Sequence, residues 1–344
     1  MTTYGFLILP AMNKVYGRTS LRLTQAELKV VNEAVLSERL TGIGERSIAG
    51  VPYVTFECGG LGRRQLAHLS NLSSVYALFE LGAETLRPVA LSPLDRFDDD
   101  LLTIQKYVGK TNEHFTKLLL NVTLACSEPA RDLPGRKLAV LDPLCGRGTS
   151  LNQAMMYGFD ASGMELDAKS FESYAHFITT WLRDKRLKHR AEQSRIRRNR
   201  KTVARRLRIS LAARKDDYKA GRTQEIEVVN DDTRNALDHF PEGSFDAIVA
   251  DLPYGIQHGS RVAGSGAARN PAELLREALP GWTALLRKGS AMGLSWNTRV
   301  LGHASLVELL EQSGLRVVDS PAFREFRHRV DQSIVRDLLV AVRP

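Results

Sequence analysis

Residues 138–155, LAVLDPLCGRGTSLNQAM, combine an acidic residue with a glycine loop. An apolar strand ends in Asp142, Gly146 and Gly148 follow in a tight turn, and Thr149 opens a helix. Ligands of doubly wound sheets bind at such carboxyl ends of strands, and glycine lets the backbone approach a ligand closely. The pattern therefore predicts a small-molecule site, with an ordinary strand-to-helix turn as the alternative.

This loop lacks the features of the common phosphate-binding loops. A dinucleotide fingerprint would need a third glycine where Leu151 stands, and a P-loop would need Gly-Lys-Ser/Thr. The carboxylate of Asp142 would also repel a pyrophosphate, whereas it suits the cationic ammonium and sulfonium of S-adenosylmethionine. We therefore expect S-adenosylmethionine at this loop, with Asp142, Cys145 and the two glycines around it, and we expect Cys145 to pack there rather than react.

The next two strands also end in acidic residues. The strand ending SGMELD presents Glu165, which we expect to accept hydrogen bonds from both ribose hydroxyls of the cofactor, with Asp167 as the competitor or the cap of the next helix. The following strand presents Asp231 and Asp232. We expect Asp232 to accept from the adenine amino group, although either residue can instead cap a helix.

A second motif, FDAIVADLPYG (residues 245–255), is again an apolar strand that ends in an acid. It resembles the (Asn/Asp)-Pro-Pro-(Tyr/Phe) motif of class I methyltransferases that modify exocyclic amino groups of bases, with Leu252 replacing the first Pro. The resemblance implies that Asp251 and a backbone carbonyl near Leu252 or Pro253 accept hydrogen bonds from the amine, and that Tyr254 stacks on an extruded base. We also count Asp251 among the residues that border the cofactor. A strand followed by a plain Pro-Gly turn is the alternative.

From residue 106 to 344 the chain resembles the catalytic domain of the THUMP-associated tRNA guanosine-N2 methyltransferases. DPLCGRGTSL, DLPYGIQHG and the C-terminal HRVDQSIVRDLLVAVR carry this resemblance. YVGKTNEHFTKLLLN (residues 107–121) sits where that family has a helix closing over the methionine end of the cofactor, which places Thr111 among the cofactor-binding residues. The resemblance implies methylation of guanosine N2 in RNA, most closely tRNA. Residues 1–105 resemble that family's N-terminal region only loosely.

Two other functions stay open at this point. A DNA amino-methyltransferase acting on adenine N6 or cytosine N4 would present a similar aromatic amine to Asp251. A nucleic-acid-binding protein with a vestigial cofactor pocket belongs to a different class, and the intact acids and glycines of both motifs argue against it.

The elements around these motifs alternate between strands and helices, which favours a parallel sheet covered on both faces. We expect an α/β, Rossmann-like class I methyltransferase fold with a seven-stranded, mostly parallel sheet over residues 106–344. Residues 1–105 are expected to form a smaller α+β domain with a possible RNA-binding role. There we expect a helix over 24–37, capped by Thr24 with Glu27 completing a capping box, and a second helix over 66–81.

The charge of the protein is concentrated in one segment. Between residues 181 and 222 there are 17 Lys and Arg but 4 Asp and Glu, whereas the whole chain carries a net charge of +9. Val203, Leu207 and Leu211 fall four apart, which predicts a helical arm inserted between two strands but outside the sheet. We expect this arm to bind RNA phosphates, with a solvated charge run as the alternative. The assigned contact residues are Arg197, Arg198, Arg200, Lys201 and Arg205.

The composition of the chain bears on its cellular location and on whether disulfides or metal sites are expected. No apolar run approaches the roughly 18 residues of a membrane span, and the N-terminal residues lack the pattern of a signal peptide. The three cysteines are far apart and contain no CxxC, so we expect neither a disulfide framework nor a metal site, and we expect a cytoplasmic protein.

Overall fold

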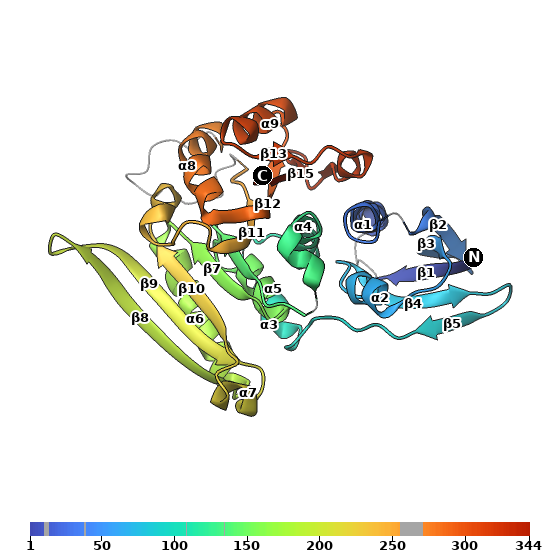
Figure 1. Cartoon of the computed structure of the whole chain (residues 1–344), viewed down its shortest axis with the longest axis horizontal. Coiled ribbons are helices and arrows are strands. Elements are labelled where there is room, and N and C mark those ends of the chain that lie inside the picture. Colours follow the sequence, from blue (N-terminus) through green and yellow to red (C-terminus); the bar gives the residue numbers. More distant parts are fainter. Residues whose placement is uncertain (10–13, 38, 108, 134, 255–270) are drawn as a thin grey trace.

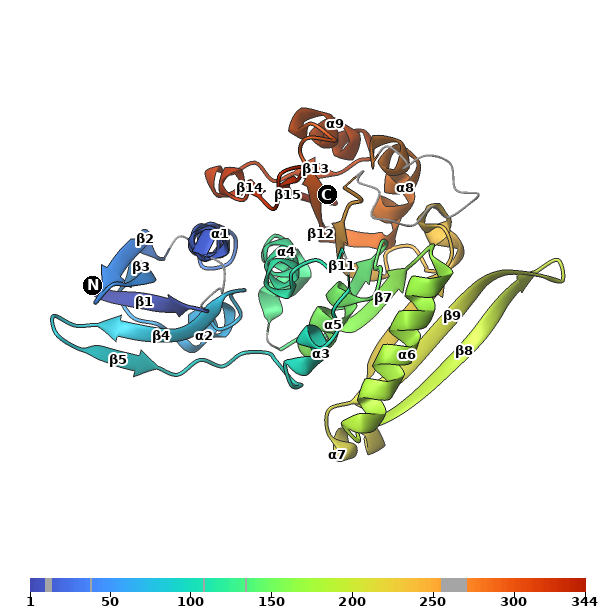
Figure 2. The ribbon, with the colours of Figure 1, turned by 180° about the vertical axis from the view of Figure 1, so that it is seen from behind.

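The structure is a computed structural model of the chain, and it describes residues 1–9, 14–37, 39–107, 109–133, 135–254 and 271–344. A smaller sheet of N-terminal residues and a larger sheet of later residues lie side by side (Figure 1). Helices α1 (Lys14–Ala34) and α4 (Glu113–Ala125) pack against each other between them (Figures 1 and 2).

The larger sheet has the strand order β13-β15-β12-β11-β6-β7-β10-β9-β8. Neighbours from β12 to β10 are parallel, whereas β15 and β9 join this block in antiparallel fashion. The expected seven-stranded, mostly parallel sheet is confirmed for β13 through β10, and β14, β8 and β9 are additions. The strands are β6 (Ala139–Asp142), β7 (Asp160–Met164), β8 (Lys188–Arg198), β9 (Lys201–Ala212), β10 (Gln224–Asn230), β11 (Phe245–Asp251), β12 (Leu286–Asn297), β13 (Arg316–Val317), β14 (His328–Arg329) and β15 (Val335–Val342).

Helices cover both faces of this sheet, and its central strands are therefore buried on both sides. Val140 belongs to the core under α4, α5 and α6, whereas its neighbour Leu141 belongs to the core under α8 and α9. Figure 2 shows α5 and α6 lying across the first face. The elements are α3 (Asp100–Thr103), η1 (Glu128–Asp132), α5 (Thr149–Met156), α6 (Ala168–Asp184), α7 (Lys215–Lys219), η2 (Thr233–Asp238), α8 (Pro271–Leu285), α9 (His303–Gln312) and η3 (Pro321–Glu325).

The predicted helical arm is wrong, since residues 188–212 form a β-hairpin. Leu207, Ile209 and Leu211 are buried together on one face, so the four-residue spacing of the sequence is twice the two-residue period of a strand. Asn199 and Arg200 both have positive φ, at 51° and 63°, as a tight two-residue hairpin turn requires. The hairpin also belongs to the sheet, because β9 pairs with β10 over seven residues.

The N-terminal residues form an antiparallel sheet with the order β2-β3-β1-β4-β5. The strands are β1 (Thr2–Ile8), β2 (Thr41–Ile48), β3 (Val51–Cys58), β4 (Val75–Leu81) and β5 (Leu86–Val89), and α2 (Arg63–Leu69) precedes β4. This α+β character agrees with expectation. The division of the chain near residue 105 stays a prediction; residues 90–99 connect β5 to α3.

Two local predictions in this region are wrong. The first helix begins at Lys14, so Thr24 lies inside it and its hydroxyl donates to the carbonyl of Ser20 at 2.8 Å. The predicted helix over 66–81 is instead α2 followed by β4. The apolar residues of β4 matched a helical pattern by chance.

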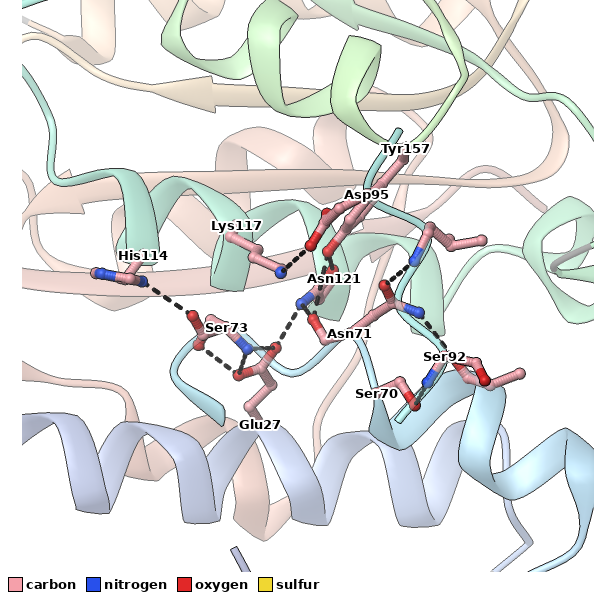
Figure 3. A network of polar contacts seen from close by, with 12 residues as sticks. Glu27, Ser70, Asn71, Ser73, Ser92, Asp95, His114, Lys117, Asn121 and Tyr157 are labelled. Atoms are coloured by element: carbon pink, nitrogen blue, oxygen red, sulfur yellow. Dashed lines mark hydrogen bonds and ion pairs between the residues drawn. The ribbon is translucent and has the colours of Figure 1, made fainter. Parts of the chain in front are cut away.

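Glu27, expected to close a capping box, is instead fully buried in a polar network between the two sheets (Figure 3). Its carboxylate accepts from the backbone N–H and the hydroxyl of Ser73, the latter at 2.6 Å, and from Nδ2 of Asn121 at 2.7 Å. Asn121, on α4, also donates to the carbonyl of Asn71 and accepts from the hydroxyl of Tyr157. Burial raises the pKa of Glu27, so these donors are what compensates for removing its carboxyl from water.

We expect Asn121→Ala to lower the free energy of unfolding by about 2–3 kcal/mol, because it removes one of the buried donors to Glu27, the nearer of two donors to the carbonyl of Asn71, and the acceptor of the Tyr157 hydroxyl. Urea unfolding followed by circular dichroism measures this. The control is Tyr157→Phe, which removes one hydroxyl from the edge of the network and should cost about 1 kcal/mol. Equal destabilisation in the two variants would show that the contacts of Asn121 with Glu27 and Asn71 add nothing.

Candidate active site

A cavity of about 330 Å³ lies at the carboxyl edge of the larger sheet, where β6 and β11 end. It is lined by both sequence motifs and by the chain that leads into α4. The predicted residues on its wall are Thr111, Asp142, Cys145, Gly146, Asp251, Pro253 and Tyr254. The structure therefore brings the two motifs, about a hundred residues apart in sequence, to one site.

The glycine loop after β6 depends on the missing side chains of its glycines. Gly146 and Gly148 have φ of +53° and +79°. A Cβ on Gly148 would lie 2.2 Å from the ring of Tyr174. The sulfur of Cys145 packs against Gly163 of β7, and burial raises the pKa of its thiol well above the usual value. Cys145 therefore packs, as expected, and is not a reactive thiolate.

Asp142 is buried at the base of the cavity. Its carboxylate accepts from the hydroxyl of Ser150 and, at 2.9 Å, from the backbone N–H of Leu144. The pKa of Asp142 is raised to about 7, mainly by burial and in smaller part by the nearby carboxylates of Asp251 and Glu165, while its two hydrogen bonds oppose the rise. Asp142 and Asp251 line the same cavity, and the charge of Glu165 acts on Asp142 from nearby, which favours a cationic ligand.

The structure separates the two candidates for the ribose contact. Asp167 caps α6, since its carboxylate accepts from the backbone N–H of Ser170 at 2.9 Å. Glu165 stands at the end of β7, beside the backbone of Gly146, and burial raises its pKa. The ribose role of Glu165 stays a prediction, with its competitor already occupied by a helix cap.

Asp232 was predicted to contact the adenine of the cofactor, but its carboxylate makes contacts within the protein. It caps η2, and its carboxylate pairs with the guanidinium of Arg234 at 2.6 Å. Asp232 does not border the cavity formed by the described residues. Its contact with adenine stays a prediction.

Asp251, at the end of β11, receives hydrogen bonds from three hydroxyl groups. Tyr254 donates to both carboxylate oxygens, at 2.5 and 2.7 Å, and Thr111 donates to Oδ2 at 2.5 Å. Ser295, at the end of the neighbouring strand β12, donates to Oδ1. Burial raises the pKa of Tyr254, and the charge of Asp251 adds to this, so the phenol stays a donor.

Arg336 and Ser295 are site residues that sequence reasoning missed. Arg336 is a charged residue inside the apolar strand β15, and only 4% of its side chain is exposed. Its guanidinium lies 4.4 Å from the ring centroid of Phe115, 5.1 Å from that of Tyr254, and 3.9 Å from Oδ2 of Asp251. The sequence signal that could have identified it is a charged residue in the mostly apolar strand sequence VRDLLVAV.

The basic residues assigned to RNA fall into two groups. Arg197, Arg198, Arg200 and Lys201 are exposed at the tip of the hairpin. Arg205 lies farther down β9, where its guanidinium contacts Glu172 at 2.5 Å and covers the ring of Phe171. The structure thus assigns Arg205 to contacts within the protein.

The parallel strand order with a glycine loop after β6 and an acidic motif after β11 defines a class I, Rossmann-like methyltransferase. Residues 117–293, just over half of the chain, match the family described as RMKL-like, methyltransferase domain, and the chain belongs to that family. The protein is therefore an S-adenosylmethionine-dependent methyltransferase, as its motifs predicted. No match was found among curated proteins.

Solved structures of several methyltransferases are similar to the chain. TrmN from Thermus thermophilus is 14% identical over 100% of both chains, with a TM-score of 0.43. A putative rRNA methylase from Clostridium thermocellum is 14% identical, covering 60% of this chain and 89% of its own, with a TM-score of 0.36. A TehB-like S-adenosylmethionine-dependent methyltransferase from Corynebacterium glutamicum is 16% identical, covering 62% and 83%, with a TM-score of 0.34. These TM-scores are too low to carry an argument about substrate.

The residues of the cavity fit S-adenosylmethionine. The backbone of the glycine loop leaves a cradle that side chains would fill, and the acidic groups match the positive charge of the ligand. No group of His, Cys, Asp and Glu suited to a metal ion occurs among the described residues. None of the helices in the described ranges is long and apolar enough to cross a membrane.

We expect the affinity for S-adenosylmethionine to rise about tenfold from pH 6 to pH 8. With a pKa of about 7, Asp142 is mostly protonated at pH 6 and ionised at pH 8, and only the ionised form attracts the cation. Isothermal titration calorimetry across this range measures the effect.

Two variants check the origin of this pH dependence. Asp142→Asn should bind more weakly and lose the rise, whereas Ser150→Ala should move the midpoint to higher pH, because the Ser150 hydroxyl lowers the pKa of Asp142. A rise of the same size in Asp142→Asn would assign the titration to another group.

Proposed function

We propose that the protein methylates an exocyclic amino group of a base in RNA, and specifically guanosine N2 in tRNA. The observation that carries the proposal is the Asp251 carboxylate, held at the cavity wall within an Asp-Leu-Pro-Tyr sequence. The likeness of both motifs to the tRNA guanosine-N2 methyltransferases supports the choice of base and of RNA. The concentration of basic residues in the hairpin supports a polyanionic substrate.

The contacts of Asp251 indicate how an amine would enter. The three hydroxyl groups and Arg336 already surround the two carboxylate oxygens, so a substrate N–H must replace one of these partners. Tyr254 is the partner suited to leave, because it belongs to the motif loop and its hydroxyl is shared between both oxygens. Its ring would then stack on the base while the amine takes the place of the hydroxyl.

In this arrangement the protein acts by position and electrostatics. The nitrogen lone pair of the amine is delocalised into the base, and hydrogen bonds from its N–H groups to Asp251 return electron density to nitrogen. S-adenosylmethionine, when bound, supplies a methyl group on a positively charged sulfur. Asp251 would hold the amine nitrogen toward this methyl group; transfer of the methyl group would leave the sulfur as a neutral thioether, and the proton lost from nitrogen would pass to solvent. The carboxylate of Asp251 would stabilise the positive charge that develops on nitrogen.

Transfer of labelled methyl groups from S-adenosylmethionine to unfractionated tRNA, rRNA and genomic DNA tests the proposal. The expected product after digestion of tRNA to nucleosides is N2-methylguanosine. Labelled N6-methyladenine or N4-methylcytosine in DNA would assign the enzyme to the DNA amino-methyltransferases. Cofactor binding without transfer to any of these nucleic acids would refute the proposal.

A pair of substitutions separates the ring of Tyr254 from its hydroxyl. We expect Tyr254→Phe to keep kcat/KM for RNA within about threefold of wild type, because the stacking face remains and the hydroxyl is displaced during turnover. Tyr254→Ala should lower kcat/KM by about 5- to 150-fold, the range expected when one base–aromatic stack is removed. Steady-state assays with tRNA measure both, and an equal reduction in the two variants would show that the hydroxyl, not the ring, is used.

A further inference from the structure

The β8–β9 hairpin extends past the edge of the sheet that holds the active site. β9 runs antiparallel to β10, and Arg205 pairs with Asn230, the last residue of β10. Residues 195–204 therefore lie beyond the carboxyl end of β10, with the turn at Asn199 and Arg200 farthest out. Four residues of extended strand, from Lys201 to Ala204, reach about 13 Å at roughly 3.3 Å each.

The same edge carries Asp142 and Asp251, because β6, β7, β10 and β11 are parallel. Four strand spacings separate β11 from β9 in the sheet order. At roughly 4.8 Å each they place the hairpin about 19 Å from β11 along the sheet. Figure 1 shows the hairpin turn at one end of the ribbon and α7 at the opposite end.

The basic residues of the hairpin fall into two groups, those on the part paired with β10 and those at the tip. Residues 188–212 contain ten Lys and Arg and one Glu. Along the part that pairs with β10, arginines are neutralised by the protein: Arg206 and Arg208 both pair with Glu227, and Arg205 pairs with Glu172.

At the tip the arrangement is different. We define the tip cluster as Arg197, Arg198, Arg200 and Lys201, all of which are exposed. Arg198 pairs with Asp238 at 3.1 Å, an exposed contact of small energy, and the other three have no ion pair within the described residues. Like charges close together on one hairpin turn repel one another, and a polyanion that lies against them removes this cost.

Resting on the proposed function, we propose that the tip cluster is a clamp for the phosphate backbone of the substrate RNA, a few nucleotides away from the base that enters the active site. The hairpin places these charges on the active-site edge, and its pairing with β10 fixes their position. A gap of about 19 Å corresponds to roughly six nucleotides of a stacked strand at about 3.4 Å each. The clamp thus holds the flanking RNA and leaves the chemistry to Asp251.

The test compares two variants in which four exposed basic residues are neutralised. The tip variant is R197Q/R198Q/R200Q/K201Q. The matched control, K188Q/R190Q/K215Q/K219Q, removes the same number of charges from the opposite end of the hairpin and from α7. Binding of unfractionated tRNA is measured without methyl transfer, by fluorescence anisotropy at several salt concentrations, and S-adenosylmethionine binding by calorimetry confirms that each variant is folded.

Removing a single phosphate contact should flatten the slope of log affinity against log salt by about 0.9 on a duplex or about 0.7 on a single strand. It should weaken binding by about five- to eightfold at about 0.1 M salt. We expect the tip variant to show this flattening for at least two phosphates, and the control to keep the wild-type slope. An unchanged slope in the tip variant, or equal flattening in the control, overturns the clamp.

Two further results separate this inference from the function it rests on. If wild type methylates tRNA while the tip variant binds tRNA normally, the clamp is wrong and the proposed function stands. If the tip variant fails to bind tRNA but wild type transfers no methyl group to RNA, the clamp stands and the proposed function is wrong. Weaker binding to phosphatidylserine vesicles by the tip variant, with tRNA binding unchanged, would assign the surface to membranes and overturn the clamp.

Discussion

The guanidinium of Arg336 lies between the rings of Phe115 and Tyr254, and the carboxylate of Asp251 is 3.9 Å away. This buried cation joins three parts of the chain: α4, the loop after β11, and the C-terminal strand β15. A buried arginine is costly without a partner, and the carboxylate of Asp251 and the two rings are the partners of Arg336. In return, the position of the Asp251 carboxylate is set before a substrate arrives, which is the preorganisation that the proposed methyl transfer would use.

Helix α4 links this arrangement to the N-terminal sheet. One side of the helix carries Phe115 and Thr116 to the cavity, while the side with Asn121 and Lys117 contacts the polar network around Glu27 (Figure 3). A shift of the N-terminal sheet would therefore move the helix that borders the cofactor cavity. The buried hydrogen bonds of Glu27 favour a single relative position, because an alternative position would leave its carboxylate without donors.

Sequence patterns predicted the structure correctly where a chemically distinctive residue directly follows an apolar strand. Asp142 and Asp251 each end a run of apolar residues followed by a loop with a distinctive composition, so both strands and their meeting at one edge could be predicted. The hairpin was missed because Val203, Leu207 and Leu211 fit a helix and a strand equally well, and only pairing with β10 decides between them. Glu27 was misplaced for a related reason: a capping box is a local pattern, whereas its real partners Ser73 and Asn121 are distant in sequence.

In the proposed function, the Asp251 carboxylate orients an amine for methyl transfer and does not hold the cofactor in place. Single-turnover methylation of tRNA by Asp251→Asn, together with calorimetric binding of S-adenosylmethionine, separates the two roles. The substitution keeps the size of the side chain but removes its charge and one acceptor. We expect a rate reduced by about 100-fold or more with cofactor affinity within a few-fold of wild type. A wild-type rate in this variant, or an effect confined to cofactor binding, would contradict it.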